Sequence, residues 1–146
     1  MKKVLLPVIA LFLGVSLMAQ TKADSLIKMN VEKHDFGKIK QGIPVTYTVE
    51  IKNISDKPLV VQNTWASCGC TTPEKTTQPI APGATAKLKV QYNAAAIAPF
   101  TKDVYIQLAG VTNPKTVQIT GEVLNADAYD AWVKSNGKSK DSKTNN

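Results

Sequence analysis

The sequence contains no arginine: all 18 of its basic residues are lysines, set against 11 acidic residues. Proteins that bind nucleic acids favour arginine, because its planar guanidinium group matches phosphates and guanine edges. Some of the lysines lie at the extreme N-terminus or in the C-terminal tail, so the remaining chain is only mildly basic. We therefore expect the lysines to form a solvated surface, and we expect no nucleic-acid partner.

The motifs of common enzyme classes are also absent. The sequence has no glycine-rich phosphate loop and no Gly-x-Ser-x-Gly nucleophile elbow. Acidic residues such as Asp35, Glu50 and Glu74 are scattered along the chain, and nothing marks two of them as a pair. The sequence therefore predicts a protein that is not an enzyme, with thiol chemistry at its cysteines left open.

Long apolar runs are absent after the first twenty residues, but one such run lies within them. Residues 1–3 are Met-Lys-Lys, residues 4–18 are mostly apolar, and the small residue Ala19 precedes Gln20. This order is typical of a secretory signal peptide over residues 1–19. The run is short for a membrane span, which needs about 20 residues. We therefore expect an exported protein, periplasmic or secreted, with no membrane span after signal cleavage.

The middle of the chain alternates apolar and polar residues with a period of two. The runs that show this alternation, together with two shorter apolar runs, are residues 31–36, 45–52, 59–61, 86–92, 103–108 and 116–123. Each run predicts a strand with one buried and one solvated face. About seven short strands separated by turns predict an all-β, immunoglobulin-like two-sheet sandwich over residues 31–124. Residues 20–30 are expected to form an N-terminal linker.

The C-terminal part of the chain has a different pattern. Asn125 precedes a short segment of helical period in which Tyr129 and Trp132 share one face. We predict a short helix over residues 125–134 and a disordered tail over residues 135–146, which contains only small, polar and charged residues. The helix either covers an edge of the sandwich or binds a partner through its two aromatic residues, which are favoured at interfaces.

Only two cysteines are present, and a single residue separates them in the segment Ser-Cys-Gly-Cys-Thr at residues 67–71. Cysteines this close cannot join the two sheets, as the distant pair of an antibody domain does. Gly69 permits a turn that would bring the sulfurs together. Trp65 and Thr71 flank the pair and are expected to support it, with Trp65 either shielding a sulfur or closing the end of the core.

Three interpretations of Cys68 and Cys70 follow from an oxidising compartment, where thiols are paired, metal-bound or reactive. A disulfide closing so small a loop contributes only ~1.6 kcal/mol through chain entropy, which favours local chemistry over a staple for the fold. A strained pair of this kind would also suit redox exchange. Two thiolates could instead bind copper or zinc, with His34 as the one histidine available. We expect no other cofactor.

Several short segments are more specific than the strand pattern. They are His34-Asp35-Phe36-Gly37, Asn53, the Ser-Cys-Gly-Cys-Thr segment with Pro73, Pro79-Ile80-Ala81-Pro82-Gly83 and Gly121-Glu122-Val123. Together they resemble the secreted domain-of-unknown-function family numbered fifteen-seventy-three, over residues 31–123. The resemblance implies an immunoglobulin-like sandwich, similar to domains of ciliary and centrosomal scaffold proteins. It implies no established activity.

The sequence therefore predicts an exported, non-catalytic immunoglobulin-like module that binds proteins or has a structural role in the cell envelope. Its partners would be envelope or extracellular proteins. The alternative is a periplasmic thiol-redox or copper/zinc-binding protein that uses Cys68 and Cys70.

Overall fold

The computed structural model describes residues 22–74 and 78–141. The signal peptide expected over residues 1–19 lies outside these ranges. The elements are η1 (Ala23–Ser25), β1 (Ile27–Met29), β2 (Lys33–Lys40), β3 (Val45–Asn53), β4 (Val61–Ala66), β5 (Thr71–Pro73), β6 (Thr85–Tyr92), β7 (Pro99–Leu108), β8 (Lys115–Leu124) and α1 (Ala126–Asp141).

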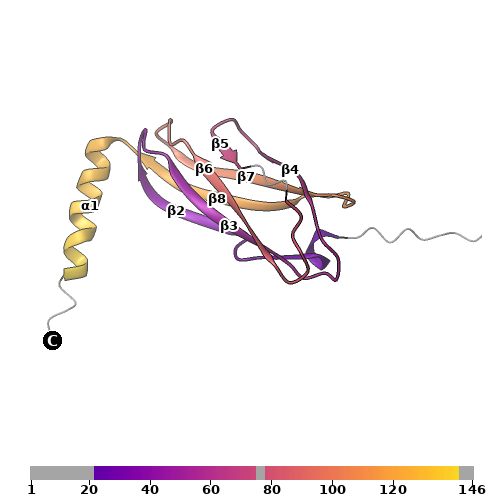
Figure 1. Cartoon of the computed structure of the whole chain (residues 1–146). Coiled ribbons are helices and arrows are strands. Elements are labelled where there is room, and N and C mark those ends of the chain that lie inside the picture. The colour runs from indigo at the N-terminus through magenta and orange to yellow at the C-terminus, as the bar shows by residue number, and fades with distance from the viewer. Residues whose placement is uncertain (1–21, 75–77, 142–146) are drawn as a thin grey trace, which may run out of the picture.

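The strands form two four-stranded sheets that pack as a sandwich (Figure 1). The first sheet has the order β1-β3-β6-β5 and the second sheet has the order β2-β8-β7-β4. Neighbouring strands are antiparallel except β2 and β8, which run parallel. The prediction of an all-β, immunoglobulin-like sandwich is confirmed.

The apolar positions of the alternating runs fill the space between the sheets. Eight of these side chains are completely buried: Val49, Ile51, Leu88, Val90, Val104, Ile106, Val117 and Ile119. Their polar neighbours along each strand point to solvent, because successive side chains of a strand lie on opposite faces. The predicted strand register is therefore correct for β3, β6, β7 and β8.

The N-terminal boundary of the sandwich lies earlier than the sequence predicted. Residues 20–30 were expected to form a linker, but Ile27 pairs with Asn53 on β3, and both Ala23 and Ile27 are buried in the core. The expectation is wrong from Ala23 onward. A strand of three residues is too short to show a period, so only its pairing with β3 defines it.

The C-terminal helix begins as predicted, because the Asn125 side chain accepts a hydrogen bond from the Ala128 amide at 2.8 Å. It extends away from the sandwich (Figure 1) and continues to Asp141. The helix is therefore longer than the expected 125–134, and residues 142–146 of the expected tail lie outside the described ranges. Polar composition predicts little burial, but a helix without burial still forms its own backbone hydrogen bonds. No helix in the described ranges is both long and apolar enough to cross a membrane.

Candidate functional site

Cys68 and Cys70 form a disulfide in the connection between β4 and β5, which is also where the chain crosses from the second sheet to the first. Their Cα atoms lie 5.3 Å apart. The Thr71 amide donates a hydrogen bond to the Cys68 carbonyl at 3.3 Å, which closes the turn. The disulfide is therefore a local bridge within a single turn. We call residues 67–70 the cysteine turn.

Backbone hydrogen bonds fix the cysteine turn to both sheets. The Ser67 amide donates to the Asp103 carbonyl at 2.9 Å, and the Asp103 amide donates to Ser67 Oγ at 3.1 Å. The Asn93 amide donates to the Cys70 carbonyl at 3.0 Å. The turn is thus attached to β7 on one side and to the end of β6 on the other, independently of the sulfurs.

The two sulfurs lie in different surroundings. Cys70 is half-buried and packs against the hydrophobic core. Cys68 is also half-buried, and its Sγ lies 3.7 Å from Oγ1 of Thr71, a residue that is only 4% exposed. Thr71 therefore contacts one member of the pair through its hydroxyl group.

Glycine is not required at position 69 by the turn that forms. Gly69 is absent from the residues with positive φ among the described ranges, and a Cβ added to it would meet nothing within 4 Å. The turn that was expected to use the freedom of Gly69 does form, but it does not draw on that freedom. The backbone bends between the cysteines in a conformation that any residue adopts.

Trp65 neither shields a sulfur by any contact described nor closes the end of the core. It lies on β4 directly opposite Tyr105 of β7, and the two rings stack with centroids 5.3 Å apart. The Trp65 residue is 38% exposed. Because Thr64 is buried, its neighbour Trp65 must point to the outer face of the second sheet. Both expected roles of Trp65 are corrected by this register.

His34 belongs to an aromatic cluster and not to a metal site with the cysteines. Its ring stacks on Tyr47 at 3.7 Å between centroids and meets the edge of Phe36 at 4.6 Å. Burial lowers the pKa of His34, and the nearby negative charge of Asp35 opposes this effect only in part. In residues 22–74 and 78–141, no three His, Cys, Asp or Glu side chains gather as a metal site would require.

Two further loops lie beside the cysteine turn at the same end of the sandwich. The Gly42 amide donates to the Ala94 carbonyl at 2.9 Å, and the Gln41 side chain donates to the Ala95 carbonyl at 3.0 Å. These bonds join the loop between β2 and β3 to the loop between β6 and β7, which begins at the hydrogen bond to Cys70. We call residues 41–44, 67–70 and 93–98 together the loop end.

The loop end exposes two large aliphatic side chains that the sequence analysis missed. Ile43 is 58% exposed and Ile97 is 53% exposed. A usable signal was present in the sequence, because residues 94–99 read Ala-Ala-Ala-Ile-Ala-Pro and show neither a strand nor a helix period. An apolar run outside any periodic element predicts an exposed apolar loop.

The base of α1 is attached next to the loop end. The Gln41 amide donates to the Leu124 carbonyl at 2.8 Å, just before the helix begins. Lys40 of β2 pairs with Asp130 at 3.1 Å and lies over the Tyr129 ring at 6.0 Å. Trp132 is half-buried and rests against Tyr129, with ring centroids 5.9 Å apart. Lys40 therefore links the first turns of the helix to the sandwich, and the two predicted partner-binding residues form one aromatic pair.

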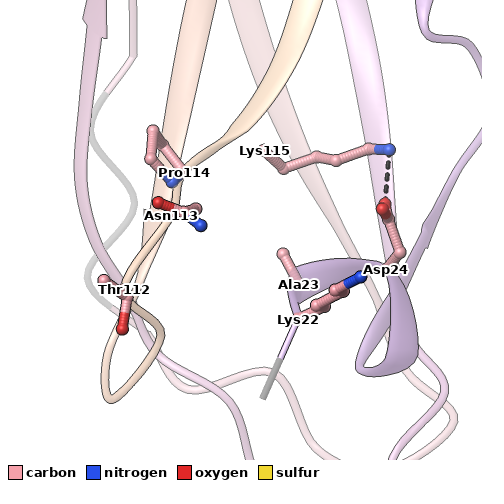
Figure 2. A pocket seen from close by; sticks show the side chains of 7 residues that line it. All are labelled: Lys22, Ala23, Asp24, Thr112, Asn113, Pro114 and Lys115. Carbon is pink, nitrogen blue, oxygen red and sulfur yellow. Dashed lines mark hydrogen bonds and ion pairs between the residues drawn. The ribbon is translucent and has the colours of Figure 1, made fainter. Parts of the chain in front are cut away.

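The opposite end of the sandwich has a polar hollow between η1 and the turn before β8 (Figure 2). Lys115 reaches across it and pairs with Asp24 and with Glu32, the latter at 2.7 Å. Hydrogen bonds to Asp24 and then to Glu32 raise the pKa of Lys115 above its ordinary value. Because this lysine is already matched by two carboxylates, the cluster attaches the N-terminal segment to β8.

Solved structures with the same class of fold support the immunoglobulin-like β-sandwich of this chain. A protein of unknown function from Porphyromonas gingivalis W83 aligns with a TM-score of 0.59 and 16% identity, covering 73% of this chain and 50% of that one. The PapD-like domain 7 of human CEP192 aligns with a TM-score of 0.54 and 8% identity, covering 70% and 87%.

A secreted serine protease, VesC from Vibrio cholerae, also aligns, with a TM-score of 0.56 and 14% identity. The alignment covers 69% of this chain but 24% of the protease. The chain thus spans about half of the Porphyromonas protein and about a quarter of the protease. At these identities the likeness concerns the fold and not the activity.

No curated protein matches the sequence. The sequence profile of the family described as "Protein of unknown function (DUF1573)" matches residues 27–123. The chain belongs to this family. The match begins at Ile27, the first residue of β1, and ends at Val123 within β8, so it spans both sheets and the cysteine turn.

Proposed function

We propose that the protein is an exported, protein-binding module of the cell envelope, and that it binds through the loop end. The observation that carries this proposal is the exposure of Ile43 and Ile97 on two loops that are hydrogen-bonded to each other. Gly42 and Pro44 flank Ile43, and alanines flank Ile97. Large apolar side chains gathered on neighbouring loops are a feature of interaction sites.

Two physical effects favour binding at the loop end: the burial of apolar surface and the fixed conformation of the loops. Full burial of an isoleucine contributes about 1.5–3 kcal/mol, so covering Ile43 and Ile97, which are little more than half exposed, contributes about that amount for the two together. The loops are already fixed by the hydrogen bonds of Gly42 and Gln41 to the 93–98 loop. A preformed surface loses little conformational entropy on binding, and more of the gain appears as affinity.

Binding at a loop end fits the architecture. Sandwiches of this class present clusters of loops at their ends, supported by a rigid core. One aligned structure is an adhesin, SrpA from Streptococcus sanguinis, with a TM-score of 0.52 at 11% identity over 75% of this chain and 59% of that one. A sandwich of this class in an adhesin supports a binding role.

Export rests on the sequence of residues 1–19. Their basic start, apolar run and small final residue predict cleavage after Ala19. The mature chain should begin at Gln20, and the intact mass of protein recovered from outside the cytoplasm measures this directly. A retained Met1 in that material would contradict the proposal of a cleaved signal.

The test of the binding surface uses two purified variants of the mature protein. The first carries Ile43→Ser and Ile97→Ser. The matched control carries Ile54→Ser, since Ile54 is 50% exposed but follows β3 at the opposite end of the sandwich. Each protein is immobilised, envelope proteins of the producing cells are passed over it, and the dissociation constant of each retained protein is then measured.

We expect the double variant to bind the partner at least about tenfold more weakly, which corresponds to about 1.4 kcal/mol. The control should bind it as the unchanged protein does. Equal weakening in both variants would place the interface elsewhere. A complete lack of specific binding by the unchanged protein would reject the proposed function.

A further inference from the structure

We propose that Cys68 and Cys70 form a thiol–disulfide exchange centre for cysteine-containing exported polypeptides, in which Cys68 is the exchanging sulfur and Thr71 is its positioning residue. The inference goes beyond the binding function and does not depend on it. It rests on the unlike surroundings of two sulfurs that belong to one short bridge.

The surroundings favour a thiolate at Cys68 and disfavour one at Cys70. Cys70 packs against the hydrophobic core, and apolar surroundings raise the pKa of a thiol. Cys68 Sγ lies 3.7 Å from the Thr71 hydroxyl, whose one hydrogen bond in the described part of the chain is this contact. A hydroxyl that donates to a thiolate stabilises the charged form. Cys68 is therefore the better nucleophile of the two.

The turn does not need the disulfide for its shape. The Ser67 amide donates to the Asp103 carbonyl and the Asn93 amide donates to the Cys70 carbonyl, so backbone groups hold the turn. A bridge that closes so small a loop also constrains the unfolded chain very little. After reduction the two thiols would remain adjacent, and the bridge could form and break repeatedly within an unchanged fold.

The exchange is a two-electron reaction with a substrate disulfide. The Cys68 thiolate attacks one sulfur of that disulfide, a Cys68–substrate bond forms, and the other substrate sulfur leaves as a thiolate. Cys70 then loses its proton to water and attacks Cys68 Sγ, which releases the second substrate thiolate. The protein pair is oxidised and the substrate is reduced; with a substrate dithiol the same steps run in reverse.

The first test compares the two single variants, Cys70→Ser and Cys68→Ser, purified under reducing conditions. We expect the remaining thiol of Cys70→Ser to be alkylated by iodoacetamide at pH 7 at least about tenfold faster than that of Cys68→Ser. The ratio should fall to about one in denaturant, where the surroundings are lost. Only Cys70→Ser should form a stoichiometric mixed disulfide with oxidised glutathione. Equal reactivity of the two folded variants would overturn the proposal.

The second test addresses Thr71 in the Cys70→Ser background. Thr71→Val keeps the shape of the side chain but removes the hydroxyl, so it should raise the pKa of the Cys68 thiol and slow its alkylation at pH 7 several-fold. Thr71→Ser restores a hydroxyl and should restore both values. If the Cys68 thiol has the same pKa in the Thr71→Val variant as with Thr71 unchanged, the role of Thr71 is overturned.

A third measurement uses the unchanged protein. The pair should equilibrate with mixtures of reduced and oxidised glutathione, and the reduced protein should transfer electrons to a disulfide-bonded polypeptide such as insulin. A bridge that stays fully oxidised in every glutathione mixture would identify a permanently structural disulfide and would also overturn the proposal.

Discussion

Two connections flank strand β4, one from β3 and one to β5, and different interactions stabilise them. The connection after β3 is organised by the buried amide of Asn53, whereas the connection to β5 contains the Cys68–Cys70 disulfide. One relies on hydrogen bonds alone and the other contains a covalent bond. We expect the fold to depend less on the disulfide than on the hydrogen bonds of Asn53, because a bridge across so small a loop constrains the unfolded chain very little.

The Asn53 side chain is completely buried and fully satisfied. Its amide nitrogen donates to the carbonyls of Lys57 and Ile80, both at 2.8 Å. Its carbonyl oxygen accepts from the Ser55 amide at 2.9 Å and from Ser55 Oγ at 2.7 Å. Loss of this side chain would remove all four of these hydrogen bonds at a completely buried position.

The largest effect is expected for Asn53→Ala. Because it removes four hydrogen bonds made by a completely buried side chain, it should lower the free energy of unfolding by about 2–4 kcal/mol in urea denaturation. Asn113→Ala is the matched control, since Asn113 is exposed and should be within about 0.5 kcal/mol of the unchanged protein. If Asn53→Ala lowers the free energy of unfolding by less than about 1 kcal/mol, the hydrogen bonds of Asn53 are not more important to the fold than the disulfide.

The double substitution Cys68→Ser, Cys70→Ser should have a smaller effect. Chain entropy accounts for only ~1.6 kcal/mol in so small a loop, so the total loss should stay below about 2 kcal/mol and the sandwich should remain folded. Urea denaturation measures the loss, and far-ultraviolet circular dichroism checks the strands. Unfolding of the double variant would show that the bridge supports the fold after all.

Each single cysteine variant should behave worse than the double variant in an oxidising medium. An unpaired thiol then remains, and intermolecular disulfides form. Non-reducing gel electrophoresis should show dimers for the single variants and none for the double variant.

The pH dependence of stability should come from His34 and not from either of the two connections. Burial lowers the pKa of His34 from its ordinary value of 6.5, so the unfolded chain takes up this proton more readily than the folded protein. The contribution of His34 to stability is complete above that ordinary value and is lost as the pH falls through the lowered value of the folded state. The same loss should appear in the unchanged protein, in Asn53→Ala and in the double cysteine variant.

His34→Phe should abolish this part of the pH dependence while keeping an aromatic ring beside Tyr47. Urea midpoints measured between pH 8 and pH 5 provide the readout, with pH values chosen to span about one unit or more on either side of the ordinary pKa. A different pH dependence in either loop variant would mean that a titrating group of that connection had been overlooked.

The smallest effect is expected for Gly69→Ala. The added Cβ has open space around it and the backbone has no positive φ, so stability should change by less than about 0.5 kcal/mol and the disulfide should still form. Gly121→Ala is the contrast, because its Cβ would lie 2.8 Å from both the Gly37 carbonyl oxygen and the Phe100 ring. It should cost about 1–3 kcal/mol.

The sheets were more predictable than the site. Runs such as residues 86–92 place every second side chain on one face, so burial follows from the backbone geometry and the strand period alone. β1 escaped prediction because three residues show no period, and α1 was predicted too short because composition reports on burial and not on backbone hydrogen bonding. Trp65 was assigned to the wrong surface because its face depends on where β4 begins.

The sequence by itself determined the class of fold, the local nature of the cysteine pair and the cap that starts α1. Each of these depends on residues that are close in the chain, whose spacing fixes the geometry. The tertiary structure decided which loops meet. Ile43 and Ile97 belong to one surface only because β3 pairs with β6 and sets Gly42 against Ala94. No local pattern encodes such a contact, since it arises when distant segments share one core.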